Sequence, residues 1–322
     1  KPQTVGGVTF KGRSNFVLTG RYIHFTGFLF DNCDHDESPI ELDRSIHCRI
    51  SDNIFQHGGG EKAVITIQPG ARTNIIEHCQ FIDIAGRSVN LRINQTKDDR
   101  DIPFGNIIQR NLFQDIPPKG ENGRETVKIG QDQPTNGHVR VGTIVEDNTF
   151  IRCNGEGEII SNKCAANIYR RNTFMDCDGE LVMRGGRDCL IEANRLINCK
   201  SGIRLSGSHH EVRDNVIINS RGTGIRLLFG MTKEQGGHYQ AAGHCVIENN
   251  TIIDAARAGI LIGDGMNRDW EEKGIQNVPP SENHFRNNLV LGSSPDLFIV
   301  NNAPDNILKE NQFLLSKNYE KR

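Results

Sequence analysis

Four residues whose types can do chemistry lie close together in the middle of this 322-residue sequence. Glu156 and Glu158 alternate along one short segment, Lys163 follows, and Arg184 lies about one repeat further on. Two neighbouring carboxylates repel each other unless a cation lies between them, and calcium prefers several oxygen ligands, carboxylates among them. A lysine close to an arginine and a metal has its charged form disfavoured, which suits a general base. The segment therefore predicts a metal site beside a base, although each residue alone is also ordinary on a solvated strand.

The elements that must position these residues follow from an internal repeat. A unit of an apolar residue, two or three polar residues, Asn and further apolar residues recurs along the chain, and Asn148, Asn172, Asn194 and Asn215 follow one another at 24, 22 and 21 residues. That interval is about one coil of three short strands. The apolar residues alternate with period two and are rich in Ile, Val and Phe, so strands are favoured over helices. Asn tolerates a left-handed turn, and its amide can stack on its neighbours.

We therefore predict an all-β, single-domain fold over residues 1–322, a right-handed parallel β-helix, with a frayed tail from about residue 314. Insertions such as DQPTNGHVRVG and FGMTKEQGGHYQAAG are expected on one face, where solenoids commonly build their binding surface. Aligning Cys153, Cys177 and Cys199 places Glu158 beside Val182 and Arg204 in this prediction. Glu156, Lys163 and Arg184 then converge with them on one patch.

Composition excludes several classes of protein. The formal net charge is −2, so no overall basic field favours nucleic acid. The sequence has no run of 18 apolar residues, and we expect no membrane span. Nine cysteines are an odd number, and their recurring positions favour stacked buried thiols over a disulfide framework. The chain begins at Lys1 without an apolar leader, which is consistent with a mature or trimmed protein.

At these residues the sequence resembles polysaccharide lyase family 6, the alginate lyases and chondroitinase B. The resemblance rests on NGRETVKIG at residues 122–130, EGEIISNK at 156–163, NTF through LVMR at 172–184, and GIRLSGSHH at 202–210. It covers most of the chain from about Asn122 to Gly292. The sequence departs from the family pattern at Gly185, where a His commonly follows the Arg, and at Lys128, where Arg is commoner.

The resemblance implies a role for each residue. Lys163 would be the Brønsted base, and Arg184 the acid or the group that stabilises developing charge. Asn122, Glu156 and Glu158 would bind Ca²⁺. The expected substrate-binding residues are Lys128, Arg204, His210, Arg226 and Tyr239. Trp270 is a further residue that could stack on a sugar ring, although plain packing is the more common role of such a residue.

The function that we expect is calcium-assisted β-elimination on a uronic acid polymer, with alginate first and dermatan or chondroitin sulfate as the alternative. Calcium would neutralise the uronate carboxylate, so that the C5 proton becomes acidic enough to remove. Two other functions stay open at this point. One is a non-catalytic glycan-binding β-helix, favoured by Gly185. The other is a glycoside hydrolase with Glu156 and Glu158 as its carboxylate pair. We expect a secreted or periplasmic protein that is a monomer or a homodimer.

Overall fold

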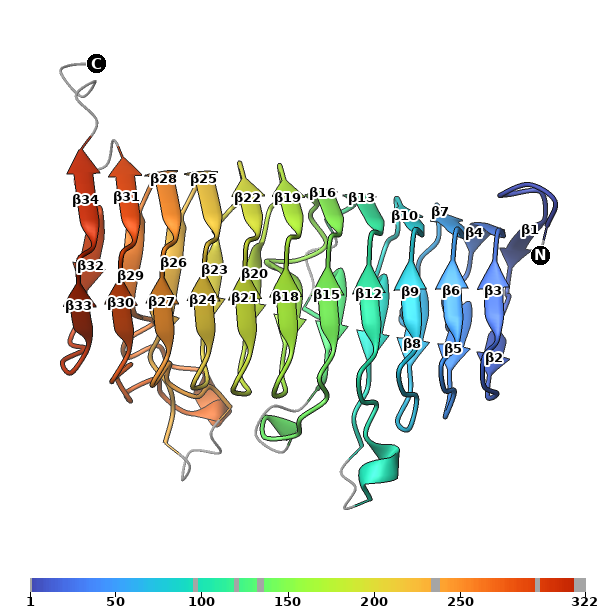
Figure 1. Cartoon of the computed structure of the whole chain (residues 1–322), viewed down its shortest axis with the longest axis horizontal. Helices are drawn as coiled ribbons and strands as arrows, with labels where there is room; N and C mark the ends of the chain where they lie inside the picture. The colour runs from blue at the N-terminus through green and yellow to red at the C-terminus, as the bar shows by residue number, and fades with distance from the viewer. Residues whose placement is uncertain are drawn as a thin grey trace.

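The computed structural model describes residues 2–94, 98–118, 122–131, 136–232, 238–292 and 296–315. Over these residues the chain winds as a right-handed parallel β-helix, and its coils stack along one long axis (Figure 1). Each coil contributes one short strand to each of three parallel sheets. The predicted fold class is confirmed.

The first sheet has 12 strands among the described residues. In spatial order they are β1 (Thr9–Gly12), β4 (Leu29–Cys33), β7 (Ile54–Gln56), β10 (Gln80–Ile82), β13 (Leu112–Ile116), β16 (Thr149–Cys153), β19 (Thr173–Met175), β22 (Arg195–Ile197), β25 (Val216–Ser220), β28 (Thr251–Ala255), β31 (Leu289–Gly292) and β34 (Gln312–Leu315).

The second sheet, which positions the candidate site, has 11 strands in the described part of the chain. They are β2 (Phe16–Leu18), β5 (Ile40–Leu42), β8 (Ile65–Ile67), β11 (Val89–Leu91), β14 (Val127–Ile129), β17 (Glu158–Asn162), β20 (Glu180–Met183), β23 (Ile203–Leu205), β26 (Thr223–Leu228), β29 (Ala258–Asp264) and β32 (Phe298–Val300).

The third sheet also has 11 described strands. They are β3 (His24–Thr26), β6 (Arg49–Ser51), β9 (Ile75–Glu77), β12 (Ile107–Gln109), β15 (Ile144–Glu146), β18 (Ile168–Arg170), β21 (Leu190–Glu192), β24 (Glu211–Arg213), β27 (Val246–Glu248), β30 (His284–Arg286) and β33 (Ile307–Lys309). Two short 3-10 turns, η1 (Asp99–Asp101) and η2 (Glu271–Lys273), lie in the connections. Among the described residues, no helix has the length and apolar character needed to cross a bilayer.

The recurring Asn forms a buried ladder between the third and first sheets. The Nδ2 atom of Asn148 donates to Oδ1 of Asn172 at 3.0 Å and to the carbonyl of Ile108 at 2.9 Å. Asn172 repeats the pattern one coil later, with Oδ1 of Asn194 at 3.0 Å. The left-handed residue of the turn is the one before each Asn, for example Asp147 with a φ of 55°. The stacking expected for Asn is therefore confirmed, whereas the left-handed conformation belongs to its neighbour.

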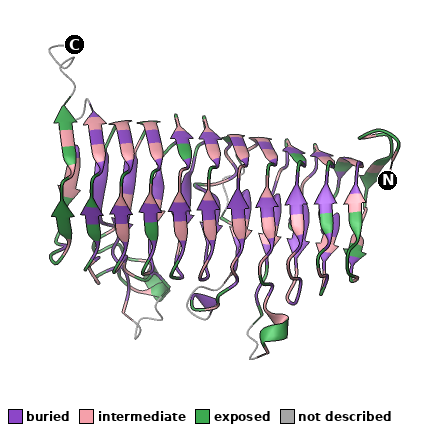
Figure 2. Ribbon diagram, in the orientation of Figure 1, coloured by how far each residue is buried: buried purple, intermediate pink, exposed green. Residues whose placement is uncertain are grey.

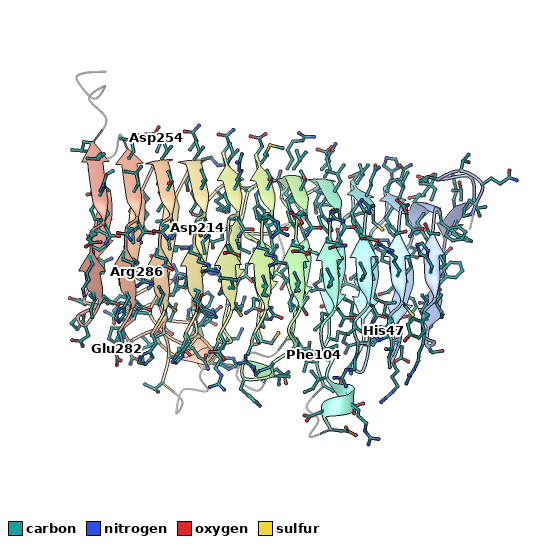
Figure 3. All side chains as sticks on the ribbon, in the orientation of Figure 1. His47, Phe104, Asp214, Asp254, Glu282 and Arg286 are labelled. Carbon is teal, nitrogen blue, oxygen red and sulfur yellow. The ribbon has the colours of Figure 1, made fainter. Side chains whose placement is uncertain are left out.

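Side chains of one kind also stack inside the coil. Phe81, Phe113, Phe150 and Phe174 follow one another with ring centroids 4.6–4.8 Å apart and nearly parallel planes. All nine cysteines are buried and unpaired, as predicted. Figure 2 shows this buried interior along the middle coils, and Figure 3 shows side chains repeating from coil to coil. Because each coil covers its neighbour, the apolar rows form one continuous core.

The long connections leave the carboxyl ends of second-sheet strands. They follow β11, β14, β26 and β29, and Figure 1 shows them projecting from the same edge of the solenoid. This arrangement confirms that the insertions gather on one face, although residues 132–135 and 233–237 within them lie outside the described residues. Strand β34 still includes residue 314, where we expected the frayed tail to begin, and residues 316–322 lie outside the described part.

Candidate active site

The register of the second sheet differs from the one predicted at the site. Glu158 pairs with Glu180 rather than with Val182, and Ser161 is the residue that pairs with Val182. Val182 does pair with Arg204. The cause is local: Glu158 comes five positions after Cys153, whereas Glu180 comes only three positions after the aligned Cys177, and a bulge between Glu158 and Ile160 adds a third extra residue. A bulge re-aims the side chains beside it, and here it lies next to Glu158.

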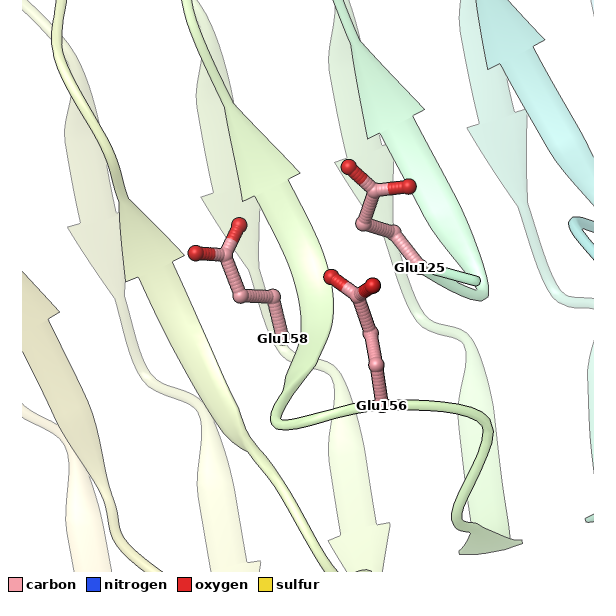
Figure 4. A group of neighbouring side chains, drawn as sticks. All are labelled: Glu125, Glu156 and Glu158. Atoms are coloured by element: carbon pink, nitrogen blue, oxygen red, sulfur yellow. The ribbon is translucent and has the colours of Figure 1, made fainter. Parts of the chain in front are cut away.

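Three carboxylates converge at the start of β14 and β17 (Figure 4). Glu125 lies just before β14, Glu156 lies in the turn before β17, and Glu158 opens β17. One oxygen of each lies within 4.8 Å of the others. Glu156 and Glu158 were predicted to meet, whereas we had assigned no role to Glu125. Its position in NGRETVKIG, one coil before Glu158 and beside the same sheet, is the signal that points to it.

Glu125 is the centre of a cluster of cations. Its Oε1 atom accepts from the Lys163 Nζ at 3.1 Å and lies 3.7 Å from the Lys128 Nζ, while its Oε2 accepts from Nε of Arg87 at 3.0 Å. Burial alone would raise the pKa of Glu125, but the charges of Lys163, Lys128 and Arg87 lower it to about 2. One carboxylate therefore faces three cations. Burial, together with repulsion from Lys163 and Arg87, lowers the pKa of Lys128 to about 8, even though Glu125 opposes the shift.

Lys163 and Arg184 occupy the same position on consecutive coils. Lys163 follows β17 and its backbone N–H donates to Ile129, while Arg184 follows β20 and its N–H donates to Asn162. Their side chains reach the acid cluster from the same wall, Lys163 at Glu125 and Arg184 at Glu158, with 3.1 Å in each contact. The structure thus brings together the amine, the guanidinium and the acids, as predicted from the repeat.

Glu158 is nearly buried and is shared by two arginines. Its Oε1 atom accepts from Arg184 and from Arg204. Burial opposes its ionisation, but these two arginines hold the pKa of Glu158 below its ordinary value. The other oxygen, Oε2, is buried without a hydrogen bond of normal geometry among the described residues, although the Ser161 hydroxyl is near enough to stabilise the carboxylate.

Glu156 has the opposite electrostatic environment. Its Oε2 atom accepts from the backbone N–H groups of Gly123 and Arg124, the latter at 2.9 Å. Burial raises the pKa of Glu156, and repulsion from Glu125 and Glu158 adds to that effect. A raised pKa at Glu156 was not predictable from the sequence. A carboxylate held among other carboxylates is stabilised in its charged form when a cation binds between them.

The residues present fit a calcium ion. The cluster supplies three carboxylates, one of them with a raised pKa and one with an orphaned buried oxygen. Asn122 is exposed and lines the same cavity as Glu156 and Glu158, which has a volume of about 420 Å³. Oxygen-only donors of this kind are the ligands that calcium takes.

Arg204 and Arg226 lie on the wall beside the site, within a ladder of ion pairs. Arg204 contacts Glu158 and Glu180, the second at 3.3 Å, and Arg226 contacts Glu180 and Asp264. Both guanidinium groups are thus held by carboxylates of neighbouring coils. The two arginines were predicted to bind substrate. In the structure their guanidinium groups form ion pairs with Glu158, Glu180 and Asp264 of the second sheet.

His210 does not lie in the groove. It is fully buried, its Nδ1 accepts from the backbone N–H of Cys189, and its Nε2 lies 3.1 Å from the carbonyl of Ser206. Burial lowers the pKa of His210 to about 4, so the ring is neutral at ordinary pH. The substrate contact predicted for this residue is therefore not what the structure shows, because a neutral ring inside the wall faces the chain itself.

Comparison with known proteins agrees with this geometry. Residues 1–321 match the family described as Chondroitinase B. A mannuronic acid specific polysaccharide lyase of family 6 from the human gut microbiota has a similar structure, with a TM-score of 0.85 and 25% identity over 98% of this chain and 74% of that one. No curated protein matches the sequence.

Two further structures share the fold. A mutant of the family 6 alginate lyase AlyGC has a TM-score of 0.85 at 24% identity, over 99% of this chain and 45% of that chain. A family 6 polysaccharide lyase from Pseudopedobacter saltans has a TM-score of 0.81 at 22% identity, over 99% and 82%. With a family match along nearly the whole sequence, the chain belongs to the chondroitinase B family, within polysaccharide lyase family 6, and is a polysaccharide lyase.

Proposed function

We propose that this lyase cleaves alginate by calcium-assisted β-elimination, with Lys163 as the base and Arg184 as its partner. The observation that supports the proposal is the position of Lys163 and Arg184 on consecutive coils, each 3.1 Å from a carboxylate of the acid cluster. The gut lyase similar to this chain is described as specific for mannuronic acid, and AlyGC as an alginate lyase. The substrate would lie across the second sheet beside the cluster.

The elimination can be written with this chain's residues. A neutral Lys163 amine takes the proton from C5 of a uronate residue, the bond between C4 and the glycosidic O4 breaks, and a double bond forms between C4 and C5. The leaving O4 receives a proton at the position that Arg184 faces. Calcium, when bound by Glu156, Glu158 and Asn122, with Glu125 beside them, would neutralise the substrate carboxylate and so make the C5 proton acidic.

The charge balance around Glu125 supports a neutral amine in the groove. Two lysines and Arg87 share one carboxylate, so the cluster carries more positive charge than it can neutralise. Burial, with repulsion from Lys163 and Arg87 added to it, lowers the pKa of Lys128 to about 8. Because Lys128 and Lys163 interact directly, a proton accepted by Lys163 can pass to a neutral Lys128 and then to solvent.

The experiment is an ultraviolet assay for the unsaturated product, with alginate as substrate. Native protein should produce absorbance, and Lys163→Ala should lower kcat between about a hundredfold and ten-thousandfold, as expected for removal of a general base. Lys309→Ala, an exposed lysine on β33 far along the solenoid, is the matched control and should retain full activity. Full turnover by the folded Lys163→Ala variant would remove Lys163 from the mechanism.

Calcium binding needs a readout that is independent of turnover. Titration calorimetry of chelator-treated protein with CaCl₂ should show binding, and Glu156→Gln should weaken it because a carboxylate ligand is lost. Chelator should also lower the activity of the native protein, with recovery when calcium is added back. Equal heats for native and Glu156→Gln proteins would place the ion elsewhere.

Dermatan sulfate is the second candidate substrate, because the matching family is described as Chondroitinase B. The same assay with dermatan sulfate in place of alginate separates the two. A polymer of this kind is met outside the cytoplasm, so we propose that the protein acts in the periplasm or after secretion.

A further inference from the structure

Arg184 is held on a second side by an aromatic ring. Its Nη2 atom donates to the Tyr239 hydroxyl at 2.9 Å, and its guanidinium carbon lies 5.0 Å from the centre of the Tyr239 ring. Tyr239 is only 7% exposed. The ring that we predicted to contact substrate is therefore largely covered, and its polar end is directed at the arginine.

Trp270 covers Tyr239 from the next inserted loop. The two rings stack with their centroids 5.0 Å apart and their planes at 24°. The indole Nε1 donates to Oε1 of Gln276 at 2.9 Å. Gln276 is itself fully buried, and its Nε2 donates to the carbonyl of Phe229. A chain of contacts thus runs from Arg184 through two aromatic rings and an amide to the backbone at the end of β26.

The two loops that carry these residues are joined to each other. Gly230 and Val278 exchange backbone hydrogen bonds of 2.8 and 3.0 Å, and the N–H of Met231 donates to the carbonyl of Tyr239 at 2.7 Å. The first loop follows β26 and the second follows β29. The stack therefore rests on fixed backbone rather than on side chains alone.

We propose that Trp270 and Gln276 are positioning residues, which hold Tyr239 so that Tyr239 holds the Arg184 guanidinium over the groove. The inference rests on the proposed function of Arg184 but concerns residues to which that function assigns nothing. Glu158 alone does not fix Arg184, because Arg204 shares the same carboxylate oxygen. An aromatic face attracts the cation and restrains it in a second direction. Aromatic side chains are rigid supports, since they have only two rotatable angles.

Kinetics give the first test. In Trp270→Ala we expect kcat on alginate to fall between about ten- and a hundredfold, with a much smaller change in KM, because misplacement of a reacting group costs rate rather than binding. Trp270→Phe keeps an aromatic face and should stay within about threefold of native. Lys273→Ala, in the exposed η2 turn of the same loop, is the control and should behave as native. If the stack served folding alone, none of these variants would have a lower kcat per folded molecule.

Fluorescence gives a test that does not depend on turnover. Trp270 is the single tryptophan of the chain, so its emission reports on this stack alone. Arg184→Ala should shift the emission to longer wavelength, because Tyr239 loses its partner and the indole becomes more hydrated. Arg286→Ala, on β30, should leave it unchanged. Adding alginate oligosaccharides to the Lys163→Ala variant should also change the emission.

The two tests separate the failure of this inference from the failure of the proposed function. If the native protein releases no unsaturated product from any uronan, the proposed function fails, and the Arg184→Ala emission still decides whether the stack and Arg184 are coupled. Unchanged emission in Arg184→Ala overturns the inference. So does a native kcat in folded Trp270→Ala. A lowered kcat that Trp270→Phe restores, together with shifted emission, supports it.

Discussion

Replacing Glu125 by Gln tests whether one carboxylate holds the cations of the site together. The substitution preserves the shape of the side chain but removes its charge. Lys163, Lys128 and Arg87 would then face each other with side chains only 11, 16 and 19% exposed. Removing one partner of a buried ion pair typically costs about 3–5 kcal/mol, because the remaining charge is left uncompensated. We expect a loss of that size in the free energy of unfolding at about pH 7.

The pH dependence of this loss has a definite sign. Glu125 raises the pKa of Lys128, whose value is nevertheless lowered to about 8. Without Glu125 the ammonium form is less stable still, so the variant gives up protons more readily as the pH rises. Repulsion then decreases in the variant at a lower pH than in the native protein, so the difference in the free energy of unfolding between them should narrow as the pH rises toward about 8 and stay level above it.

Urea unfolding followed by circular dichroism measures the effect, with chelator present so that metal binding does not contribute. Glu282→Gln is the matched control, since it removes the exposed carboxylate that contacts His244 and should change stability by about 1 kcal/mol at most. If Glu125→Gln unfolds at the native urea concentration at about pH 7, the carboxylate does not hold the cluster as we argue.

Two other expectations follow from the geometry. The kcat/KM for alginate should rise with pH through about 8, because Lys128, whose pKa is about 8, must be neutral to accept the proton that Lys163 takes from C5. Lys128→Arg keeps its charge and should move this rise, and an unchanged pH profile in that variant would exclude Lys128 from it. Asn172→Ala should destabilise the protein by about 1–3 kcal/mol, because it leaves the side-chain amide of Asn148 and the carbonyl of Val145 without this hydrogen-bond partner. An unaltered unfolding midpoint would mean that the Asn ladder does not contribute to stability.

Much of the fold was predictable because it repeats. Asn148, Asn172 and Asn194 mark the coil length, and buried Cys rows mark the inner face, so periodicity alone defined the solenoid. The register at the site was not predictable in the same way. Two extra turn residues and a bulge before Ser161 shift the pairing, and neither changes the hydrophobic pattern.

The candidate site was predicted in part for a similar reason. Lys163 and Arg184 follow strands that the pattern shows, whereas Glu125 precedes a strand and owes its role to contacts with residues 38 positions away. His210 was expected to contact substrate only because its segment resembles the family pattern, and a short motif does not show that the ring is buried against Cys189 and Ser206.

The bonds between coils have a consequence for how such a site can change. Each strand of the second sheet bonds only to the strand before and the strand after it, so distance along the axis is counted in whole turns of the spiral. A coil added between β14 and β20 would leave the stacking of the strands intact and yet separate Glu125, Lys163 and Arg184 by one further step along the axis. On the proposed function such an insertion would remove activity without unfolding the protein, whereas a coil added near either end would leave this group together.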